Sequence, residues 1–401
     1  MIVFSALVHP VVFCYWGSWS NLRPGIAAFG IQDMPLDLCT HIAYSFIGLT
    51  AKGELTFPEV YNVPGKSSNI DDFIALRQRN SSLNLMVALG GWNEGSENFS
   101  IVTNDDALRA NLVKNLVNFM DEKGFNGLDV DWEYPGQRGG NETDKEAFIW
   151  LLRDLKREFE PKRWVLTASV APTQYHIDQS YDVPALNRYV DYILLMTYDY
   201  HGTWSETTGA NAPLFPQVTD EFDNGANVNA SVYTWIAEGA SRSKLILGMA
   251  AYGKTFQLTD LRQTSTGAPF DGPGIAGTFT QEPGLLSYLE VSRTIIIAHR
   301  TQPDWSVTVV NKSYVYGHID NQWVSYDNSH TIYYKGLYAS FEDLAGMMFW
   351  TLDFEDFGGH CGENYGLIRN SIRGYRSSGN SLKVYNYLFV LLILITSVFT
   401  L

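Results

Sequence analysis

The chain has 401 residues, enough for one large α/β barrel or two ordinary domains, and 45% of them are hydrophobic, so a sizeable core can form. The net charge of −15 argues against a protein that binds nucleic acid, whose phosphates require Lys and Arg. Aromatic residues make up 14% of the chain, which fits either core packing or a cleft whose flat rings stack on sugars.

The N-terminus gives conflicting signals about secretion. MIVFSALVHP is apolar but lacks a basic start, and it runs directly into the predicted strand at 11–16, whereas a signal peptide should precede the domain. Either the leader is missing or truncated, or the chain is not secreted. Secretion is favoured by five Asn-X-Ser/Thr sequons, which begin at Asn80, Asn98, Asn141, Asn229 and Asn311. In an oxidising compartment we expect Cys14 and Cys39 to form a disulfide and Cys361 to remain free.

Short apolar runs alternate along the chain with amphipathic stretches. The clearest helix is predicted over 105–124, with acids at its start and Gly124 as its stop, and another is predicted over 145–160. Alternating strands and helices indicate βα units, so the sequence predicts an α/β fold, a closed (β/α)8 TIM barrel. The predicted strands cover residues 11–16, 40–47, 84–90, 125–132, 164–170, 189–196, 244–250 and 346–351.

The segment between the seventh and eighth strands is too long for a simple crossover. Residues 254–335 are predicted to form a small α+β insertion domain, with a loop at 267–274 and a hairpin in SYVYGHIDNQWVSYD. The barrel then comprises residues 11–253 and 336–376. An insertion on a βα-loop lies beside the mouth of a barrel, so we expect it to form a wall of the cleft.

Residues 377–401 read as a C-terminal sorting or anchoring segment. The small residues SSGNS precede a short spacer and the apolar run LFVLLILITSVFTL, which is shorter than the roughly 20 residues of a spanning helix. This arrangement matches a glycosylphosphatidylinositol (GPI) attachment signal, and the alternatives are a tail anchor or a buried helix. We expect a secreted or extracellular protein whose only membrane contact is this tail.

The stretch FNGLDVDWEYP (125–135) places three carboxylates at alternate positions, Asp129, Asp131 and Glu133. Alternate side chains of a strand share a face, so all three acids point into the barrel. Close carboxylates cannot all ionise there, and at least one pKa should be raised. A carboxylic acid that stays protonated near neutral pH can act as a general acid, and Glu133 is nearest the catalytic, C-terminal end of the strand.

This stretch resembles the DGxDxDxE signature of family-18 glycoside hydrolases, the chitinases and chitinase-like lectins. The resemblance covers nearly the whole chain to about residue 374, because further motifs follow in the family's order. They are CYWGSW (14–19), THIAYSF (40–46), ALGGW (88–92), MTYDYHG (196–202), the insertion segment GPGIAGTFTQEPGLLSYLE (272–290) and FWTLDFEDF (349–357).

The resemblance implies a retaining, substrate-assisted hydrolysis without metal or other cofactor, in which the substrate's acetamide oxygen attacks C1 and forms an oxazolinium ion. It implies that Glu133 protonates the glycosidic oxygen and then activates water. Asp131 accepts a hydrogen bond from the acetamide N–H and Asp129 shares a proton with it, while Tyr198 donates to the acetamide oxygen. Trp350 is the expected floor of the site. The other expected substrate-binding residues are Tyr15, Trp19, Phe46, Trp92, Tyr134, Met196, Asp199, Trp204, Tyr252 and Lys254.

Three positions depart from the family pattern. Asn126 stands where the family usually has Asp, and we expect it to relieve charge repulsion on Asp129 and so to shift the pH–rate profile. Lys254 replaces an arginine and loses its bidentate fork. Ser292 falls where many members have a cysteine, which leaves Cys361 without a partner.

Because Glu133, Asp131 and Tyr198 are all present, we expect a chitinase that acts on chitin or chitooligosaccharides. We expect the protein to be a monomer and not to bind nucleic acid. The first alternative is a non-catalytic chitin-binding lectin, since lectin members commonly lose the terminal Glu. The second is an endo-β-N-acetylglucosaminidase acting on glycoproteins, which the large insertion disfavours.

Overall fold

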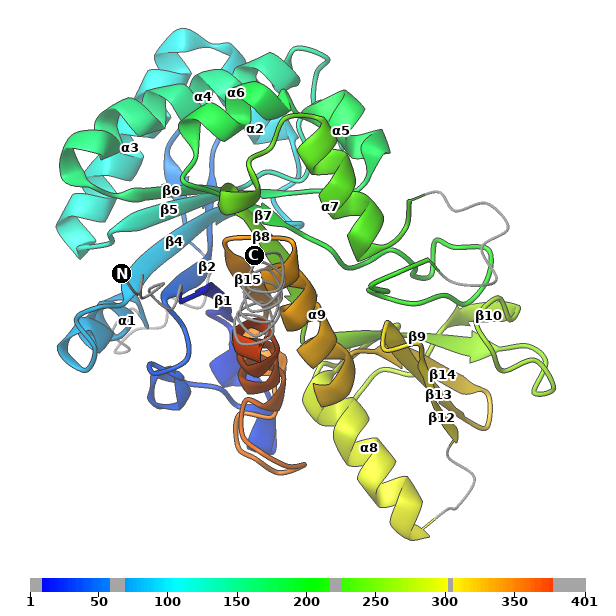
Figure 1. Ribbon diagram of the computed structural model, residues 1–401. Helices are drawn as coiled ribbons and strands as arrows, with labels where there is room; N and C mark the ends of the chain where they lie inside the picture. Colours follow the sequence, from blue (N-terminus) through cyan, green and yellow to red (C-terminus); the bar gives the residue numbers. More distant parts are fainter. Residues whose placement is uncertain (1–8, 58–68, 217–224, 302–305, 378–401) are drawn as a thin grey trace, which may run out of the picture.

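Parallel strands close into a barrel in the computed structural model of the protein, which describes residues 9–57, 69–216, 225–301 and 306–377 (Figure 1). The strand order is β1-β15-β8-β7-β6-β5-β4-β2, and β1 also pairs with β2 to close the ring. The short β3 (Leu55–Thr56) adds antiparallel to β2. All eight predicted strands are confirmed, as β1 (Val11–Gly17), β2 (His41–Leu49), β4 (Asn84–Gly90), β5 (Gly127–Asp131), β6 (Val165–Val170), β7 (Tyr192–Leu195), β8 (Leu245–Ala250) and β15 (Gly346–Trp350).

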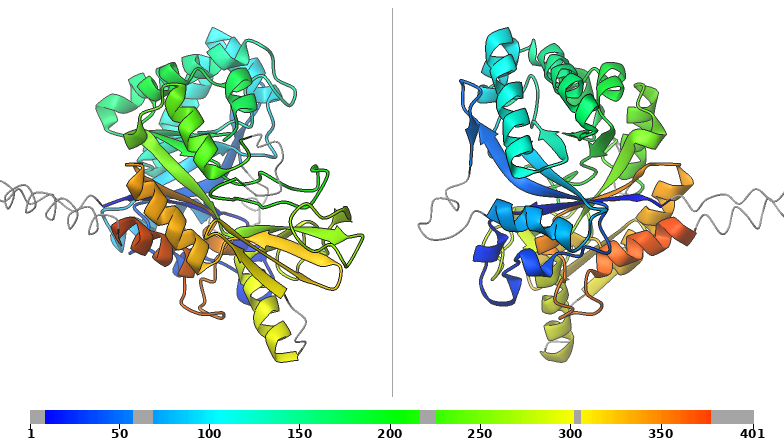
Figure 2. Two further views of the ribbon diagram at one scale, coloured as in Figure 1. Left: turned by 45° about the vertical axis from the view of Figure 1, so that its right-hand side comes forward. Right: turned by 90° about the vertical axis from the view of Figure 1, so that its left-hand side faces the viewer.

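Helices cover the outside of the barrel, as Figures 1 and 2 show. They are α1 (Asn69–Ala75), α2 (Glu97–Asn104), α3 (Asp106–Lys123), α4 (Asp144–Phe159), α5 (Gln174–Ser180), α6 (Val183–Tyr189), α7 (Val228–Ala237), α9 (Ser329–Phe341) and the helical residues 366–377. Short 3-10 helices occupy Ser20–Leu22, Gly25–Ala27, Ile31–Asp33, Leu76–Gln78, Glu160–Lys162, Arg242–Lys244 and Leu352–Phe354.

Side chains along β5 point alternately toward the surrounding helices and into the barrel interior. Trp132, directly after the strand, is fully buried, stacks on Phe99 of α2 at 5.0 Å between ring centroids and meets Phe148 of α4 at 5.8 Å. The acids at the alternate positions therefore point inward. Burial of these large apolar side chains against the helices fixes the strand's register and so the direction of the acids.

Helix α3 begins and ends where the sequence predicts. The Asp105 carboxylate caps it by accepting hydrogen bonds from the backbone N–H groups of Ala107 and Leu108, both at 2.9 Å. Gly124 ends it in the left-handed conformation, with φ of 90°. The helix thus owes its bounds to local signals that can be read from the sequence.

We expect Asp105→Ala to lower the free energy of unfolding by about 1 kcal/mol, because two backbone donors lose their acceptor. Urea denaturation followed by circular dichroism measures this change. Lys114→Ala, at an exposed position of the same helix, is the control and should change stability by less than about 0.5 kcal/mol. Equal stability of the two variants would contradict a capping role.

A second, antiparallel sheet stands beside the barrel (Figures 1 and 2). Its order is β10-β9-β14-β13-β12, with β11 also on β9, and α8 (Tyr288–Thr301) accompanies it. It follows β8 directly, so it rises from the C-terminal mouth of the barrel. The strands are β9 (Tyr252–Leu258), β10 (Phe270–Pro273), β11 (Leu285–Ser287), β12 (Ser306–Val310), β13 (Tyr314–Ile319) and β14 (Gln322–Tyr326).

The predicted hairpin is confirmed as β13–β14, but the loop predicted at 267–274 is wrong in part. Phe270 and Pro273 pair with Leu258 and Phe256 of β9 as the strand β10, with a register irregularity between them. Pro is tolerated because β10 is an edge strand. The domain boundaries at 254 and 335 stay predictions.

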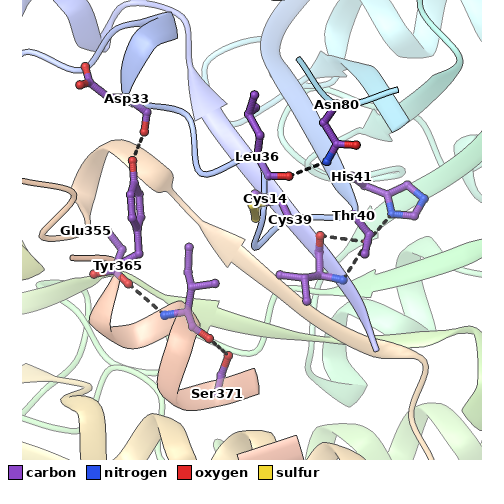
Figure 3. Close-up of a disulfide and its surroundings, with 12 residues drawn as sticks. Cys14, Asp33, Leu36, Cys39, Thr40, His41, Asn80, Glu355, Tyr365 and Ser371 are labelled. Carbon is purple, nitrogen blue, oxygen red and sulfur yellow. Dashed lines mark hydrogen bonds between the residues drawn. A yellow bond between two sulfur atoms is a disulfide. The ribbon is translucent and has the colours of Figure 1, made fainter. Parts of the chain in front are cut away.

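The predicted disulfide is present between Cys14 of β1 and Cys39, just before β2 (Figure 3). Cys361 is free. Close by, the Thr40 hydroxyl accepts from the N–H of Val12 at 2.9 Å and donates to its carbonyl at 3.1 Å. Covalent and hydrogen bonds thus fix the entry of β2 beside β1. The predictions about a truncated N-terminal signal and about the tail at 377–401 fall almost entirely on residues 1–8 and 378–401, outside the described part of the chain. Within the described residues, no helix is long and apolar enough to cross a membrane.

Candidate active site

A cavity of about 530 Å³ opens where the barrel strands end. Asp131 and Glu133 line it together with the ends of β2, β4, β7 and β15. A neighbouring cavity of about 230 Å³ shares Glu133, so the acid faces both. The first cavity collects the predicted residues Tyr15, Trp19, Phe46, Trp92, Asp131, Glu133, Met196, Tyr198, Asp199, Tyr252 and Trp350, and the second adds Tyr134 and Trp204.

Asp129 lies beneath the cavity rather than on its wall. Its carboxylate accepts hydrogen bonds from three hydroxyls, those of Tyr15 and Thr167 at 2.6 Å each and that of Ser169 at 3.0 Å. Burial raises the pKa of Asp129, and these three donors act against that rise. Asp129 is therefore held in place by neighbouring strands, and its proton sharing with Asp131 stays a prediction.

Asp131 lines the cavity, and one of its carboxyl oxygens receives no hydrogen bond from the described part of the chain. Its Oδ1 atom is buried and has no hydrogen-bond partner among the described residues. Burial raises the pKa of Asp131 well above its usual value, and the charges of Glu133 and Asp129 raise it further. An unpartnered buried acceptor costs about 1–3 kcal/mol, so this oxygen is suited to receive a donor from a ligand.

Glu133 directly follows Trp132 at the mouth and is almost fully buried. Burial is the main reason why its pKa is raised to about 7, and Asp199 adds to the rise. A hydrogen bond from Tyr134 and the charge of Arg138 act in the opposite direction. At neutral pH a substantial fraction of Glu133 thus carries a proton, as a general acid requires. The three cis peptide bonds of the described residues are Ser45–Phe46 within β2, Glu133–Tyr134 shortly after β5 and Trp350–Thr351 at the end of β15.

Strand β9 of the second sheet supplies polar side chains next to the site. The Tyr252 hydroxyl donates to Asp199 Oδ1 at 2.6 Å, and Lys254 Nζ lies 3.1 Å from the same oxygen. Lys254 itself lines neither cavity and lies 5.2 Å over the Trp204 ring. The Tyr198 ring meets Tyr252 edge-on at 5.9 Å. Lys254 thus reaches the site through Asp199 rather than facing the cavity.

Aromatic rings line both cavities, and four of those in the larger one contact each other in series. The Trp350 ring lies 5.3 Å from Tyr15 and 5.5 Å from Phe46, which in turn stacks on Trp19 at 6.4 Å. Trp92 is 58% exposed at one end of the larger cavity, and Trp204 is 64% exposed beside the smaller one. The exposed faces of such rings can stack on flat, apolar faces of a ligand.

Asn126 has no direct hydrogen bond to the acids among the described residues. It precedes β5 by one residue. It lies an odd number of positions from Asp129, so the two residues are out of step in the alternation of the strand. Its Nδ2 donates to Asn84 Oδ1 at 3.2 Å. Any effect of this position on Asp129 would act through space, and the shift of the pH profile in Asn126→Asp stays a prediction.

Several lining residues were missed. Thr56, Phe57, Asn93 and Glu94 line the larger cavity, and Thr173 and His176 line the smaller. Glu94 is the one with a sequence signal, because it follows Trp92 by two residues in a loop after a barrel strand. Burial raises its pKa. Arg138, four residues beyond Tyr134, was also missed.

Comparison with known proteins gives consistent similarities. The family model of the glycosyl hydrolases family 18 matches residues 11–355. The chain is 36% identical over 365 residues to Probable chitinase 10 of Drosophila melanogaster, which covers 88% of this chain but only 15% of that protein. It is 35% identical over 367 residues to Probable chitinase 2 of the same organism, with 88% and 73% covered.

Solved structures of similar fold include further chitinases and a pseudo-chitinase. A Group IV chitinase of Ostrinia furnacalis in complex with allosamidin is 37% identical, with a TM-score of 0.88, covering 92% of this chain and 99% of that one. Human YKL-39, a pseudo-chitinase with retained chitooligosaccharide binding, is 28% identical, with a TM-score of 0.82 and coverage of 91% and 99%.

Proposed function

The chain belongs to glycosyl hydrolase family 18, and on this premise we propose that it is a chitinase that hydrolyses β-1,4-linked N-acetylglucosamine chains. The observation that carries the proposal is the placement of Glu133, with its pKa raised to about 7, beside Asp131 in one cavity. A protonated carboxyl group and a second carboxyl group with an unpartnered oxygen are the two groups that this chemistry needs. The aromatic series along the cavities supports a chain of sugars as the substrate.

In the proposed first step the Glu133 proton passes to the glycosidic oxygen as the bond to C1 breaks. The substrate's acetamide oxygen bonds to C1, and the resulting oxazolinium cation is stabilised by Asp131, which accepts from the acetamide N–H. Tyr198 donates its hydroxyl to the acetamide oxygen and so positions it. Glu133, now ionised, takes a proton from water as the water oxygen attacks C1. The bond from C1 to the acetamide oxygen breaks, the acetamide is restored and the configuration is retained.

Hydrolysis of chitopentaose by the purified protein tests this function. We expect shorter N-acetylglucosamine oligomers, with the β-anomer as the first product in ¹H NMR. The α-anomer as the first product would contradict the substrate-assisted mechanism.

The second candidate is a lectin, favoured by the similarity to the pseudo-chitinase that binds chitooligosaccharides. In that case chitopentaose binds, as isothermal titration calorimetry would detect, but no product forms. The presence of Glu133 within the acid trio is the reason to prefer the enzyme.

We expect kcat/KM to fall as pH rises through about 7, the pKa to which burial raises Glu133. The sign follows from the role, because the general acid must be protonated and its protonated fraction falls about tenfold per pH unit above its pKa. Initial rates on chitopentaose at subsaturating concentration between pH 5 and pH 9 measure this limb. A profile that stays flat to pH 9 would exclude Glu133 as the proton donor.

We also propose an extracellular location, supported by the Cys14–Cys39 disulfide, since such bonds persist in oxidising compartments. The GPI-anchor hypothesis for the tail is tested on cells that express the full chain. Release by a phosphatidylinositol-specific phospholipase supports the lipid anchor, and retention supports a tail anchor.

A further inference from the structure

Arg138 joins two loops that frame the larger cavity. It lies in the loop after β5, and its Nη1 donates to the main-chain carbonyl of Glu133 at 2.8 Å. The same guanidinium lies over the ring of Trp92, with Cζ 3.6 Å from the ring centroid. Trp92 comes from the loop after β4. A single side chain thus contacts both the candidate acid and the most exposed aromatic ring that lines the larger cavity.

The local backbone is shaped to present this side chain. Arg138 has φ of 50°, in the left-handed region that residues other than glycine rarely adopt, between Gly136 and Gly139, which also have positive φ. A non-glycine residue in this region is strained and is held there by surrounding contacts. Arg138 is itself exposed, so burial of its side chain does not account for that conformation.

The chemistry of the contact suits a fixed orientation. A planar guanidinium stacks on an aromatic ring and donates through its edge at the same time, which an ammonium group cannot do. With one face of Trp92 covered by Arg138, the ring is left to offer its other face to the cavity. The edge that donates to Glu133 then ties the position of that ring to the main chain of the acid.

Resting on the proposed function, we propose that Arg138 is a positioning residue that couples the sugar-stacking ring of Trp92 to the placement of Glu133. The sugar contacts Trp92, and Arg138 acts through it. The contact also has an electrostatic side, because the charge of Arg138 lowers the pKa of Glu133 against the effect of burial. The other titratable groups that interact with Glu133 are Asp131, Tyr134, Tyr181, Tyr198, Asp199 and Tyr252.

A double-mutant cycle tests the coupling without requiring turnover. In a Glu133→Gln background, chitopentaose binding is measured by calorimetry for Arg138→Ala, Trp92→Ala and the double variant. We expect each single change to weaken binding about two- to fivefold, in line with an exposed cation–π contact of roughly 0.5–1 kcal/mol, and the double variant to bind no more weakly than Trp92→Ala. Arg138→Lys should resemble Arg138→Ala, because it loses the planar stack. Unchanged binding by Arg138→Ala, or single effects that multiply in the double variant, would overturn the proposal.

The pH profile with Glu133 in place separates positioning from general damage to the fold. Arg138→Ala should move the basic limb of kcat/KM to higher pH, because the positive charge no longer lowers the pKa of Glu133, whereas Arg138→Lys should leave it nearly in place. Arg157→Ala is the control, an exposed arginine of α4 whose ion pairs are with Asp154 and Glu158. It should change neither binding nor the pH limb. If the wild type has no hydrolytic activity, the proposed function fails, and the binding cycle still decides the role of Arg138.

Discussion

Replacing Glu133 by Gln should lower kcat on chitopentaose by about a thousandfold while leaving the oligosaccharide bound. The amide has the shape of the protonated acid but has no acidic proton to give to the leaving oxygen, and general acid–base catalysis typically contributes about 10²–10⁴-fold. The lining of the cavity is otherwise unchanged, so the dissociation constant of chitopentaose should stay within about threefold. The measurements are product release over time and calorimetric binding.

The loss in this variant should not come from unfolding. Glu133 is buried, and its charge is one of the causes that raise the pKa of Asp131. A neutral amide removes that repulsion, so the free energy of unfolding should be unchanged or higher. Glu158→Gln, at a half-exposed position of α4, is the matched control and should keep full activity. Residual activity within tenfold of the wild type would show that another group supplies the proton.

Much of the barrel could be predicted because its signals are local. Apolar runs mark each buried strand, and α3 carries its own cap and stop in Asp105 and Gly124. Strand β10 could not be predicted in the same way, because GAPFDGPG has the composition of a turn. Its pairing is imposed by β9 across the sheet.

The acids of the site could also be predicted, because alternation on one strand fixes their common direction. The same rule puts Asn126, with its odd spacing from Asp129, out of step with the trio, and its amide pairs with Asn84. Contacts between different loops could not be predicted from the sequence. Arg138 and Trp92 follow different strands, and nothing in either segment indicates that the guanidinium of one lies on the ring of the other.

Asp131→Asn should lower kcat by about a hundredfold with a smaller effect on binding. The Asp131 carboxyl has a buried oxygen without a partner among the described residues, and in the proposed mechanism that oxygen accepts the acetamide N–H as positive charge develops. An amide can still offer an oxygen, but it cannot ionise, whereas the Asp131 carboxyl, although its pKa is raised, can pass its proton toward Asp129 as positive charge develops beside it. Removing one preorganised electrostatic contact of this kind typically costs about 10²–10³ in kcat.

Comparing the change in kcat with the change in binding shows which role the Asp131 carboxyl has. A contact that matters only as charge develops lowers kcat, whereas a contact made equally with the bound substrate raises KM instead. Chitopentaose kinetics for Asp131→Asn are therefore compared with Asp72→Asn, an exposed acid of α1 that should behave as the wild type. If Asp131→Asn keeps its kcat within about threefold, a negative charge at this position is not needed. Tyr198 would then remain as the protein group proposed to orient the acetamide, and Tyr198→Phe would become the variant that decides how the acetamide is held.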